Sequence, residues 1–464
     1  MALVFEQFLT AEIGDATYLI GDDAAHTAAI VDPQVDVQRY IGALRKHGLA
    51  LKYVIQTHIH EDFLSGARAL HLAVPGSQLC LSGHDAPEYG FECCLIRDGD
   101  LLKVGKTVLT VKHTPGHTPE HVALLVSKAE EPPFAVLSGG SLLVGASGRT
   151  DLLGPERTEE LTSKQYQTLH DFFLGLDDGV AVYPTHVHGS PCGAAIGDKI
   201  STTIGYERAH NPMLQTSNEQ SFRIAALADL PPKPRYYPRL KDRNTSSPPM
   251  AAPPTSIRPL TAEEFRSAAK KGEARLLDTR HLLAFGGGHI PGALNIGAVG
   301  HAGIWAGWML DADCPLLLVC DDDTRVHDVV IRLARTGFAD FAGYLAGGMT
   351  AWSNAGFELQ ATQQLTVHDL AKELDASRVA VLDVRSPQEW RAGHVPGAKH
   401  IFLPELPDRL DEFDRAGSVA VYCDSGYRAS IGASLFQAAG LKAANVAGGW
   451  QAWTAGGNVT ERGL

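Results

Sequence analysis

The second half of the chain repeats itself with a period near 100 residues. The repeated segments are 276–280 (LLDTR) and 381–385 (VLDVR), 289–293 (HIPGA) and 394–398 (HVPGA), and 345–348 (LAGG) and 446–449 (VAGG). Asp278 recurs as Asp383, an offset of 383 − 278 = 105 positions, which is too long for a solenoid and indicates a duplicated domain. Each copy alternates β-branched runs with helical stretches, so we expect parallel sheets covered by helices on both faces.

The first half has a different pattern, with many short strand-like runs before and after single helices. We expect two sheets packed between helices there, so the whole chain is of the α/β class. Its 464 residues predict about three domains. Residues 230–259 are rich in proline, which predicts an extended surface connector. The expected division is a domain at 1–230, a linker at 231–257, and the two copies at 258–360 and 361–464.

Charge and cysteine content exclude several classes of function. With 40 Lys and Arg against 53 Asp and Glu, the net charge is −13, which argues against nucleic-acid binding. No apolar run approaches the roughly 20 residues of a membrane span, and the N-terminus lacks the basic residues of a secretory signal. An odd set of seven cysteines excludes a disulfide scaffold. We therefore expect a cytoplasmic protein with reduced thiols.

The last copy contains a candidate nucleophile in the loop Cys423-Asp424-Ser425-Gly426-Tyr427-Arg428, between an apolar strand and a helix. The carboxyl end of a parallel strand is where open α/β sheets bind ligands. The N–H groups of such a loop attract anions, and a nearby arginine favours the thiolate form of cysteine. Gly426 permits a tight turn with positive φ. We expect Ser425, Gly426 and Arg428 to act in catalysis with Cys423, and Asp424 and Tyr427 to contact the substrate.

The middle copy has Cys320-Asp321-Asp322-Asp323-Thr324-Arg325 at the same place. Three carboxylates raise the pKa of a thiol and repel an anionic sulfur donor. An inactive spacer domain is the favoured interpretation, and use of Cys320 is the alternative.

The Cys423 loop, with the segments 383–385 (DVR), 394–398 (HVPGA) and 447–450 (AGGW), resembles the rhodanese sulfurtransferase family over 362–464. The resemblance implies that Cys423 carries a persulfide sulfur between a donor and an acceptor.

Three histidine-bearing segments in the first half each follow a predicted strand. They are 57–63 (THIHEDF), 114–118 (TPGHT) and 183–188 (YPTHVH). Imidazole and carboxylate ligands that converge from separate strand ends hold catalytic metals. The candidate ligands are His58, His60, Asp62, His117 and His186.

Residues 1–230 resemble the metallo-β-lactamase superfamily, in its glyoxalase II and persulfide dioxygenase branch, with further matches at 148–151 (GRTD) and 201–207 (STTIGYE). The resemblance implies a mononuclear Fe(II) held by His58, His117 and an aspartate after Ser138-Gly139. This chain has Gly140 there, so zinc or no metal are the alternatives. Phe63 replaces the last histidine of the family's HxHxDH motif, which argues against a two-metal hydrolase.

Two other residues of the first half are candidates for substrate contact. Arg149 is expected to pair either with a substrate carboxylate or with Asp151. Cys192, in a loop rich in glycine and proline, is expected at the pocket rim as a sulfur relay, or else as a partly buried thiol.

The domain order resembles the bacterial persulfide dioxygenase–sulfurtransferase fusions of sulfide detoxification. This implies oxidation of a small persulfide, such as glutathione persulfide, to sulfite, and formation of thiosulfate through a Cys423 persulfide. We also expect a homo-oligomer. The alternatives are sulfur transfer alone, a thioester hydrolase of glyoxalase II type, and a non-catalytic sulfur carrier or redox sensor.

Overall fold

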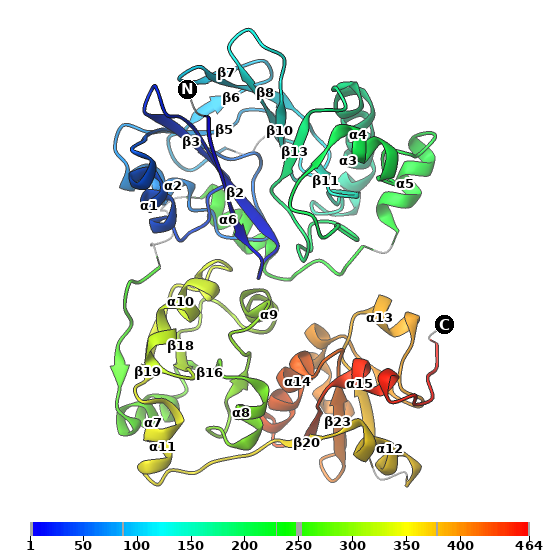
Figure 1. The fold of residues 1–464 in the computed structure, drawn as a ribbon. Helices are drawn as coiled ribbons and strands as arrows, with labels where there is room; N and C mark the ends of the chain where they lie inside the picture. Colours follow the sequence, from blue (N-terminus) through cyan, green and yellow to red (C-terminus); the bar gives the residue numbers. More distant parts are fainter. Residues whose placement is uncertain (1–2, 86–87, 229, 247–252, 377–378, 463–464) are drawn as a thin grey trace. The chain divides into compact units, whose positions relative to one another are not determined.

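The computed structural model describes residues 3–85, 88–228, 230–246, 253–376 and 379–462. The chain forms two compact units (Figure 1). The first comprises Met1–Pro253 with Ala334–Gly337, and the second comprises Pro254–Leu333 with Phe338–Leu464. Among the described residues, no helix combines the length and the apolar character needed to cross a lipid bilayer.

Two six-stranded sheets form the centre of the first unit. The first sheet contains β1 (Leu3–Thr10), β2 (Asp15–Asp22), β3 (Thr27–Val31), β4 (Ala50–Ile55), β5 (Gln78–Ser82) and β6 (Cys94–Ile96) in this order. The second has the order β14 (Thr202–Thr203), β13 (Ala181–Pro184), β10 (Ala135–Gly139), β9 (Val122–Lys128), β8 (Thr107–His113) and β7 (Leu101–Val104). A short hairpin, β11 (Leu142–Leu143) and β12 (Ala146–Ser147), follows β10.

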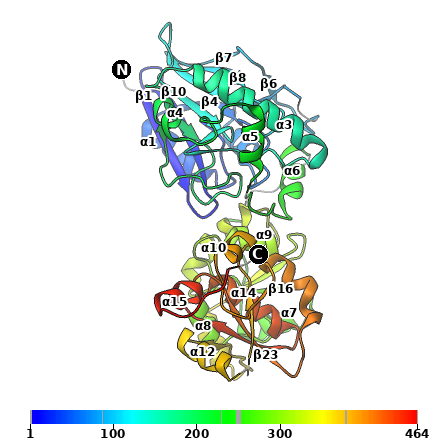
Figure 2. The same ribbon diagram turned by 90° about the vertical axis from the view of Figure 1, so that its right-hand side faces the viewer.

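Helices cover the outer faces of both sheets, as Figure 1 shows. They are α1 (Gln38–His47) and α2 (Ala67–Ala73) on the first sheet, and α3 (Pro155–Gln167), α4 (Ile204–His210) and α5 (Glu219–Leu227) on the second. Figure 2 shows α3 and α5 in front of the strands of the second sheet. Buried apolar side chains such as Tyr18, Ile55 and Leu124 fill the space between the sheets. The expected arrangement of two sheets between helices is confirmed, because one apolar face of each sheet packs on the other.

The proline-rich segment contains a helix, α6 (Tyr237–Thr245), so the expectation of an extended connector is wrong for these residues. Pro238 lies in the first turn of this helix, where the missing N–H of proline costs nothing. The side chains of Tyr237, Leu240 and Asn244 are buried. This burial attaches the segment to the first unit.

The second unit contains the duplicated domain, with two five-stranded sheets of identical topology. The middle copy consists of β15 (Pro259–Leu260), α7 (Ala262–Lys271), β16 (Arg275–Asp278), α8 (Leu282–Gly287), β17 (Leu294–Asn295), α9 (Ala302–Met309), β18 (Leu316–Val319), α10 (Val326–Ala334), β19 (Phe341–Leu345) and α11 (Gly348–Asn354). The last copy consists of β20 (Gln363–Leu365), α12 (Val367–Asp375), β21 (Ala380–Asp383), α13 (Pro387–Ala392), β22 (Lys399–His400), β23 (Ser418–Tyr422), α14 (Tyr427–Ala438), β24 (Lys442–Val446) and α15 (Gly449–Ala455). All strand pairs in both sheets are parallel, as the alternating pattern predicts.

Candidate metal and sulfur-transfer sites

The histidine-bearing segments meet at one end of the two central sheets, and all five candidate metal ligands are buried there. The exposed fraction is at most 3% for each of His58, His60, Asp62, His117 and His186. The rings of His58, His117 and His186 lie edge to face, with centroids 5.0 to 5.4 Å apart. Strand ends that are distant in sequence therefore bring the imidazoles into one cluster, as the sequence predicts.

Hydrogen bonds fix which nitrogen each ring presents to the cluster. Nδ1 of His117 lies 2.8 Å from the carbonyl oxygen of Arg149, which only accepts, so this nitrogen carries the proton and Nε2 is free. Oγ1 of Thr57 donates to Asp32 and must accept from Nδ1 of His58, at 2.9 Å. His58 therefore presents an unprotonated Nε2 as well. Such outer contacts orient metal-binding histidines.

Asp32 binds the other ring nitrogen of His60, so that His60 presents Nδ1 instead of Nε2. Its Nε2 donates to Oδ1 of Asp32 at 3.0 Å, and its Nδ1 has no partner. Burial raises the pKa of Asp32, but His60 and hydrogen bonds from neighbouring groups outweigh it and hold that pKa below its ordinary value. Phe63, at the position of the family's histidine, stacks on His60 with ring centroids 4.2 Å apart. It closes the cluster on that side without offering a ligand.

His186 lies against two carboxylates. Its Nδ1 lies 2.7 Å from Oδ1 of Asp15 and 3.2 Å from Oδ2 of Asp62. Burial alone lowers the pKa of His186, but the neighbouring Cys192 and Asp62 raise it well above its ordinary value. Its Nε2 lies 3.2 Å from the unprotonated Nε2 of His58, so a proton between the two rings relieves the repulsion of their lone pairs. A metal cation bound by these two nitrogens would relieve the same repulsion.

The donors fit a divalent metal. Buried atoms without a hydrogen-bond partner include Oδ1 of Asp62, Oδ2 of Asp15 and Nδ1 of His60. Buried polar atoms that lack hydrogen bonds are costly unless a cation balances them. Donor atoms lie within 4.8 Å of one another in three groups that share His186. The groups are His58, His60 and His186; His117, His186 and Cys192; and Asp15, Asp62 and His186.

The aspartate of the family's ligand set has no counterpart at residue 140. Gly140 donates its N–H to Nε2 of His121 at 2.9 Å. A Cβ on Gly140 would lie 2.4 Å from Cδ2 of His117 and 3.0 Å from Cδ2 of His186. The neighbouring imidazoles thus occupy the space of a side chain. The residues present fit a metal held mainly by imidazoles, in contrast to the family's set of two histidines and one aspartate.

Two contributors to this site were not predicted from the sequence. His121 is fully buried, accepts the N–H of Gly140 and contacts Oγ1 of Thr114 at 2.8 Å. Its position four residues after His117, within TPGHTPEH, was the available signal. The other contributor is helix α6.

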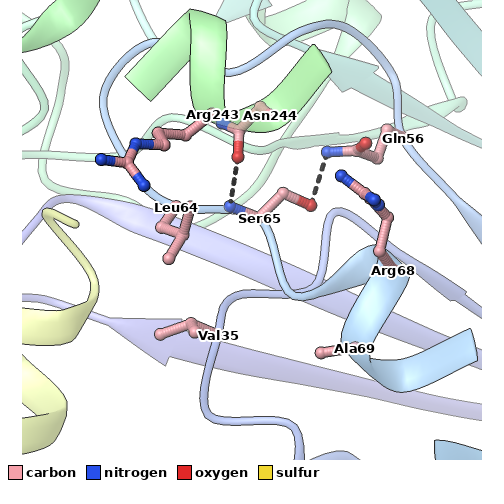
Figure 3. Close-up of a pocket in the computed structure, with 8 residues that line it drawn as sticks. All are labelled: Val35, Gln56, Leu64, Ser65, Arg68, Ala69, Arg243 and Asn244. Atoms are coloured by element: carbon pink, nitrogen blue, oxygen red, sulfur yellow. Dashed lines mark hydrogen bonds between the residues drawn. The ribbon is translucent and has the colours of Figure 1, made fainter. Parts of the chain in front are cut away.

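Helix α6 holds the loop that carries His60 through the side chain of Asn244. Nδ2 of Asn244 donates to the carbonyl oxygens of His60 and Phe63, at 2.8 and 2.9 Å. Its Oδ1 accepts the N–H of Ser65 at 2.9 Å, beside a small pocket that also contains Gln56 (Figure 3). The connector segment thereby supports the metal-ligand loop directly.

Cys192 and Arg149 are less accessible than the sequence suggests. Cys192 is 1% exposed, so the expectation of a rim position is wrong. Its Sγ lies 3.5 Å from the hydroxyl oxygen of Tyr237, and burial together with Asp62 raises its pKa to about 11. Arg149 forms a two-point ion pair with Asp151, at 2.7 and 2.8 Å, which selects the second of its two predicted partners.

The Cys423 loop has the geometry of an anion-binding turn. The N–H of Gly426 donates to Sγ of Cys423 at 3.1 Å, and Gly426 has a φ of 103°, as predicted. The N–H of Trp450 donates to the carbonyl oxygen of Cys423 at 2.8 Å, which fixes the loop from α15. Because α14 begins directly after Gly426, its positive end faces the loop.

The other residues of this loop have different partners from those expected. Arg428 forms a two-point ion pair with Glu389, at 2.7 and 2.6 Å, so its charge is largely compensated. The hydroxyl of Tyr427 donates to the carbonyl oxygen of Gly297 in the middle copy, and Asp424 accepts from Gln451. Ser425 is exposed. In this structure Tyr427 and Asp424 are therefore engaged by the protein.

The loop of the middle copy is altered in structure as well as in sequence. Burial and the carboxylates of Asp278, Asp321 and Asp323 raise the pKa of Cys320 to about 11. Asp323, which stands where Gly426 stands in the last copy, accepts the N–H of Gly347 at 3.0 Å. These contacts favour a neutral, inert thiol.

Known proteins resemble both the N-terminal and the C-terminal half of the chain. The family model described as rhodanese-like domain matches residues 261–355 and 366–456. The N-terminal part is similar to "Persulfide dioxygenase ETHE1, mitochondrial" from Bos taurus and from Homo sapiens, each 28% identical over 217 residues, which is 46% of this chain and 77% of the relative. The crystal structure titled metallo-beta-lactamase from Staphylococcus aureus subsp. aureus COL is 29% identical, with a TM-score of 0.67 over 75% of this chain and 99% of that chain.

The fold and sites define a sulfur-metabolising enzyme in which a metallo-β-lactamase fold precedes two rhodanese-like domains. In its order of domains the chain is similar to a persulfide dioxygenase–rhodanese fusion, with two rhodanese-like domains after a region homologous to persulfide dioxygenase.

Proposed function

We propose that this enzyme oxidises a small persulfide, such as glutathione persulfide, to sulfite and transfers sulfane sulfur through Cys423 to form thiosulfate. The observation that carries the proposal is the presence, in one chain, of a buried five-histidine cluster and a cysteine turn preceding a helix. The similarity to persulfide dioxygenases supports the substrate class. Physical linkage of the two sites raises the local concentration of a shared intermediate.

At Cys423 the chemistry is a pair of sulfur transfers. The thiolate attacks the sulfane sulfur of the donor, a new S–S bond forms, and the donor leaves as a thiolate. Sulfite then attacks the outer sulfur, which yields thiosulfate and regenerates the Cys423 thiolate. The Gly426 N–H, which contacts Sγ, is placed to stabilise negative charge on sulfur in both transfers.

In the first unit, His58, His117 and His186 would hold a divalent metal. When iron is bound, it supplies the activation of O2 that oxidation of a sulfane sulfur requires. Thr57, Arg149 and Asp15 hold the imidazoles in the ligating orientation. The buried surroundings exclude bulk water from the reactive sulfur.

The test measures O2 consumption, sulfite and thiosulfate from glutathione persulfide, with purified protein of known iron content. The wild-type enzyme is expected to consume O2 and release sulfite, and to form thiosulfate when sulfite and persulfide are both present. Cys423→Ser is expected to keep O2 consumption and lose thiosulfate formation. Absence of sulfite from iron-loaded enzyme would refute the oxidative half.

A second candidate is sulfur transfer alone, and the specific observation that favours it is Gly140. In that case the wild-type enzyme forms thiosulfate from sulfite and persulfide but consumes no O2 at any iron content. We further propose a cytoplasmic location, because all seven cysteines are free thiols, as a reducing compartment maintains them. A homo-oligomer stays a prediction, which light scattering would test.

A further inference from the structure

The missing carboxylate at residue 140 leaves the metal site without an anionic ligand at that position. The Cβ of any larger residue would lie 2.4 Å from His117, so the pocket has closed around the glycine. Imidazoles are neutral ligands, and a divalent cation held by them alone retains its full charge. A compensating anion is therefore expected close to the same imidazoles.

The aspartates of the cluster do not take that place. Asp15 and Asp62 both lie at Nδ1 of His186, at 2.7 and 3.2 Å. The Nε2 of His186 faces the opposite way, toward Nε2 of His58. These carboxylates thus orient His186 from behind, the role that outer carboxylates have at many histidine–metal sites.

The sulfur of Cys192 does lie close to the imidazoles. Its Sγ is within 4.8 Å of a ring nitrogen of His117 and of His186, and all three side chains are buried. The N–H of Arg149 donates to the carbonyl oxygen of Cys192 at 2.9 Å, and the carbonyl oxygen of Arg149 accepts from Nδ1 of His117. One residue thus ties the cysteine loop to the ligand histidine. The unpartnered Nδ1 of His60 independently indicates a cation in this cluster.

We propose that the thiolate of Cys192 coordinates the metal together with His117 and His186, in place of the carboxylate that residue 140 does not provide. On binding, a sulfur–metal bond forms and the thiol proton is released to solvent. The inference concerns the ligands alone, and it stands whether or not the bound metal oxidises persulfide.

A thiolate among the ligands also sets the metal preference. Sulfur and imidazole donors favour zinc, iron and cobalt over magnesium and calcium. The hydroxyl of Tyr237, 3.5 Å from Sγ, is placed to donate to the coordinated sulfur and moderate its charge. Helix α6 would thereby contribute to the metal site as well as to its loop.

The test uses the full chain, stripped of metal and titrated with Co²⁺. A thiolate ligand produces an intense near-ultraviolet sulfur-to-cobalt absorption that histidine and carboxylate ligands do not produce. The wild type is expected to show this band, Cys192→Ser to lose it, and the control Cys314→Ser to keep it. Cys314 is a suitable control because it is a free thiol in the second unit.

X-ray absorption of the zinc-loaded wild type needs no variant, so it decides the question if Cys192→Ser does not fold. A sulfur shell at about 2.3 Å is expected beside nitrogen at about 2.0–2.1 Å. A shell of nitrogen and oxygen alone, a cobalt band that survives Cys192→Ser, or failure of the wild type to bind either ion would overturn the proposal. Sulfur ligation without O2 consumption would refute the dioxygenase function and leave this inference intact.

Discussion

Substitution of Gly140 by alanine measures how tightly the imidazole cluster is packed. The added Cβ would lie 2.4 Å from Cδ2 and 2.8 Å from Nε2 of His117, closer than carbon atoms approach in folded proteins. His117 cannot retreat freely, because its backbone N–H donates to Gln165 and its Nδ1 donates to the carbonyl oxygen of Arg149. Overpacking of this kind costs about 1–3 kcal/mol.

A smaller opposing effect comes from the unfolded chain. Alanine restricts the unfolded state and returns about 0.4–1 kcal/mol of stability where the native φ is compatible. Gly140 is not among the residues with positive φ, so this gain applies. The net expectation is a first unit destabilised by about 1–2 kcal/mol, which lowers its Tm by about 2–4 °C for each kcal/mol in a domain of this size.

Differential scanning calorimetry of the metal-free full chain is the assay, with tryptophan fluorescence recorded in parallel. All six tryptophans lie between residues 305 and 453, in the second unit, so fluorescence reports that unit alone. Gly140→Ala is expected to shift the calorimetric transition and leave the fluorescence transition unchanged.

The matched control is Gly42→Ala in helix α1, where an added Cβ meets no atom within 4 Å. It should stabilise the first unit by about 0.5–1 kcal/mol through helix propensity. If Gly140→Ala is as stable as the wild type, the pocket has room for a side chain and the reasoning fails. Gly140→Asp is then the variant that should restore the family's iron site.

Three other changes have defined outcomes. Burial raises the pKa of Glu389, but the ion pair with Arg428 outweighs burial and lowers this pKa from 4.5 to about 2. The ion pair therefore stabilises the last copy above pH 4.5, and this stabilisation is lost as the pH falls toward 2. Glu389→Gln should remove that pH dependence of the fluorescence-detected Tm; an unchanged slope would contradict the assignment. Cys320 has a pKa of about 11, so about one thiol in a thousand is a thiolate near pH 8. Mass spectrometry should therefore find Cys320 unmodified by iodoacetamide, and rapid labelling would show that this thiol is not inert. Asn244→Ala leaves three buried backbone groups without their hydrogen bonds, at a cost of about 1–3 kcal/mol each. Calorimetry should then show a less stable first unit, and titration should show a weaker affinity for zinc. An unchanged zinc affinity would show that α6 does not support the site.

The architecture and the location of both sites follow from the order of residues along the chain. Repeated segments in the same order specify the same fold twice, because each copy must bury the same strands, and the two sheets indeed have one topology. His117 and His186 follow β8 and β13, which run in the same direction, so the loops after these strands emerge at the same end of the sheet. The turn at Cys423 and the positive φ of Gly426 followed from local chemistry in the same way.

Which atoms face one another depends instead on contacts between distant segments. Asp15 binds His186 across 171 positions of sequence, and no local pattern connects them. The same is true of Asn244, whose helix lies in a segment that its prolines made look extended. Cys192 is buried beside two histidines instead of at a rim, and Arg428 is paired with Glu389, because packing of distant loops sets burial and partners. Residue types fix what chemistry is available, whereas the three-dimensional contacts fix protonation, orientation and ligand choice.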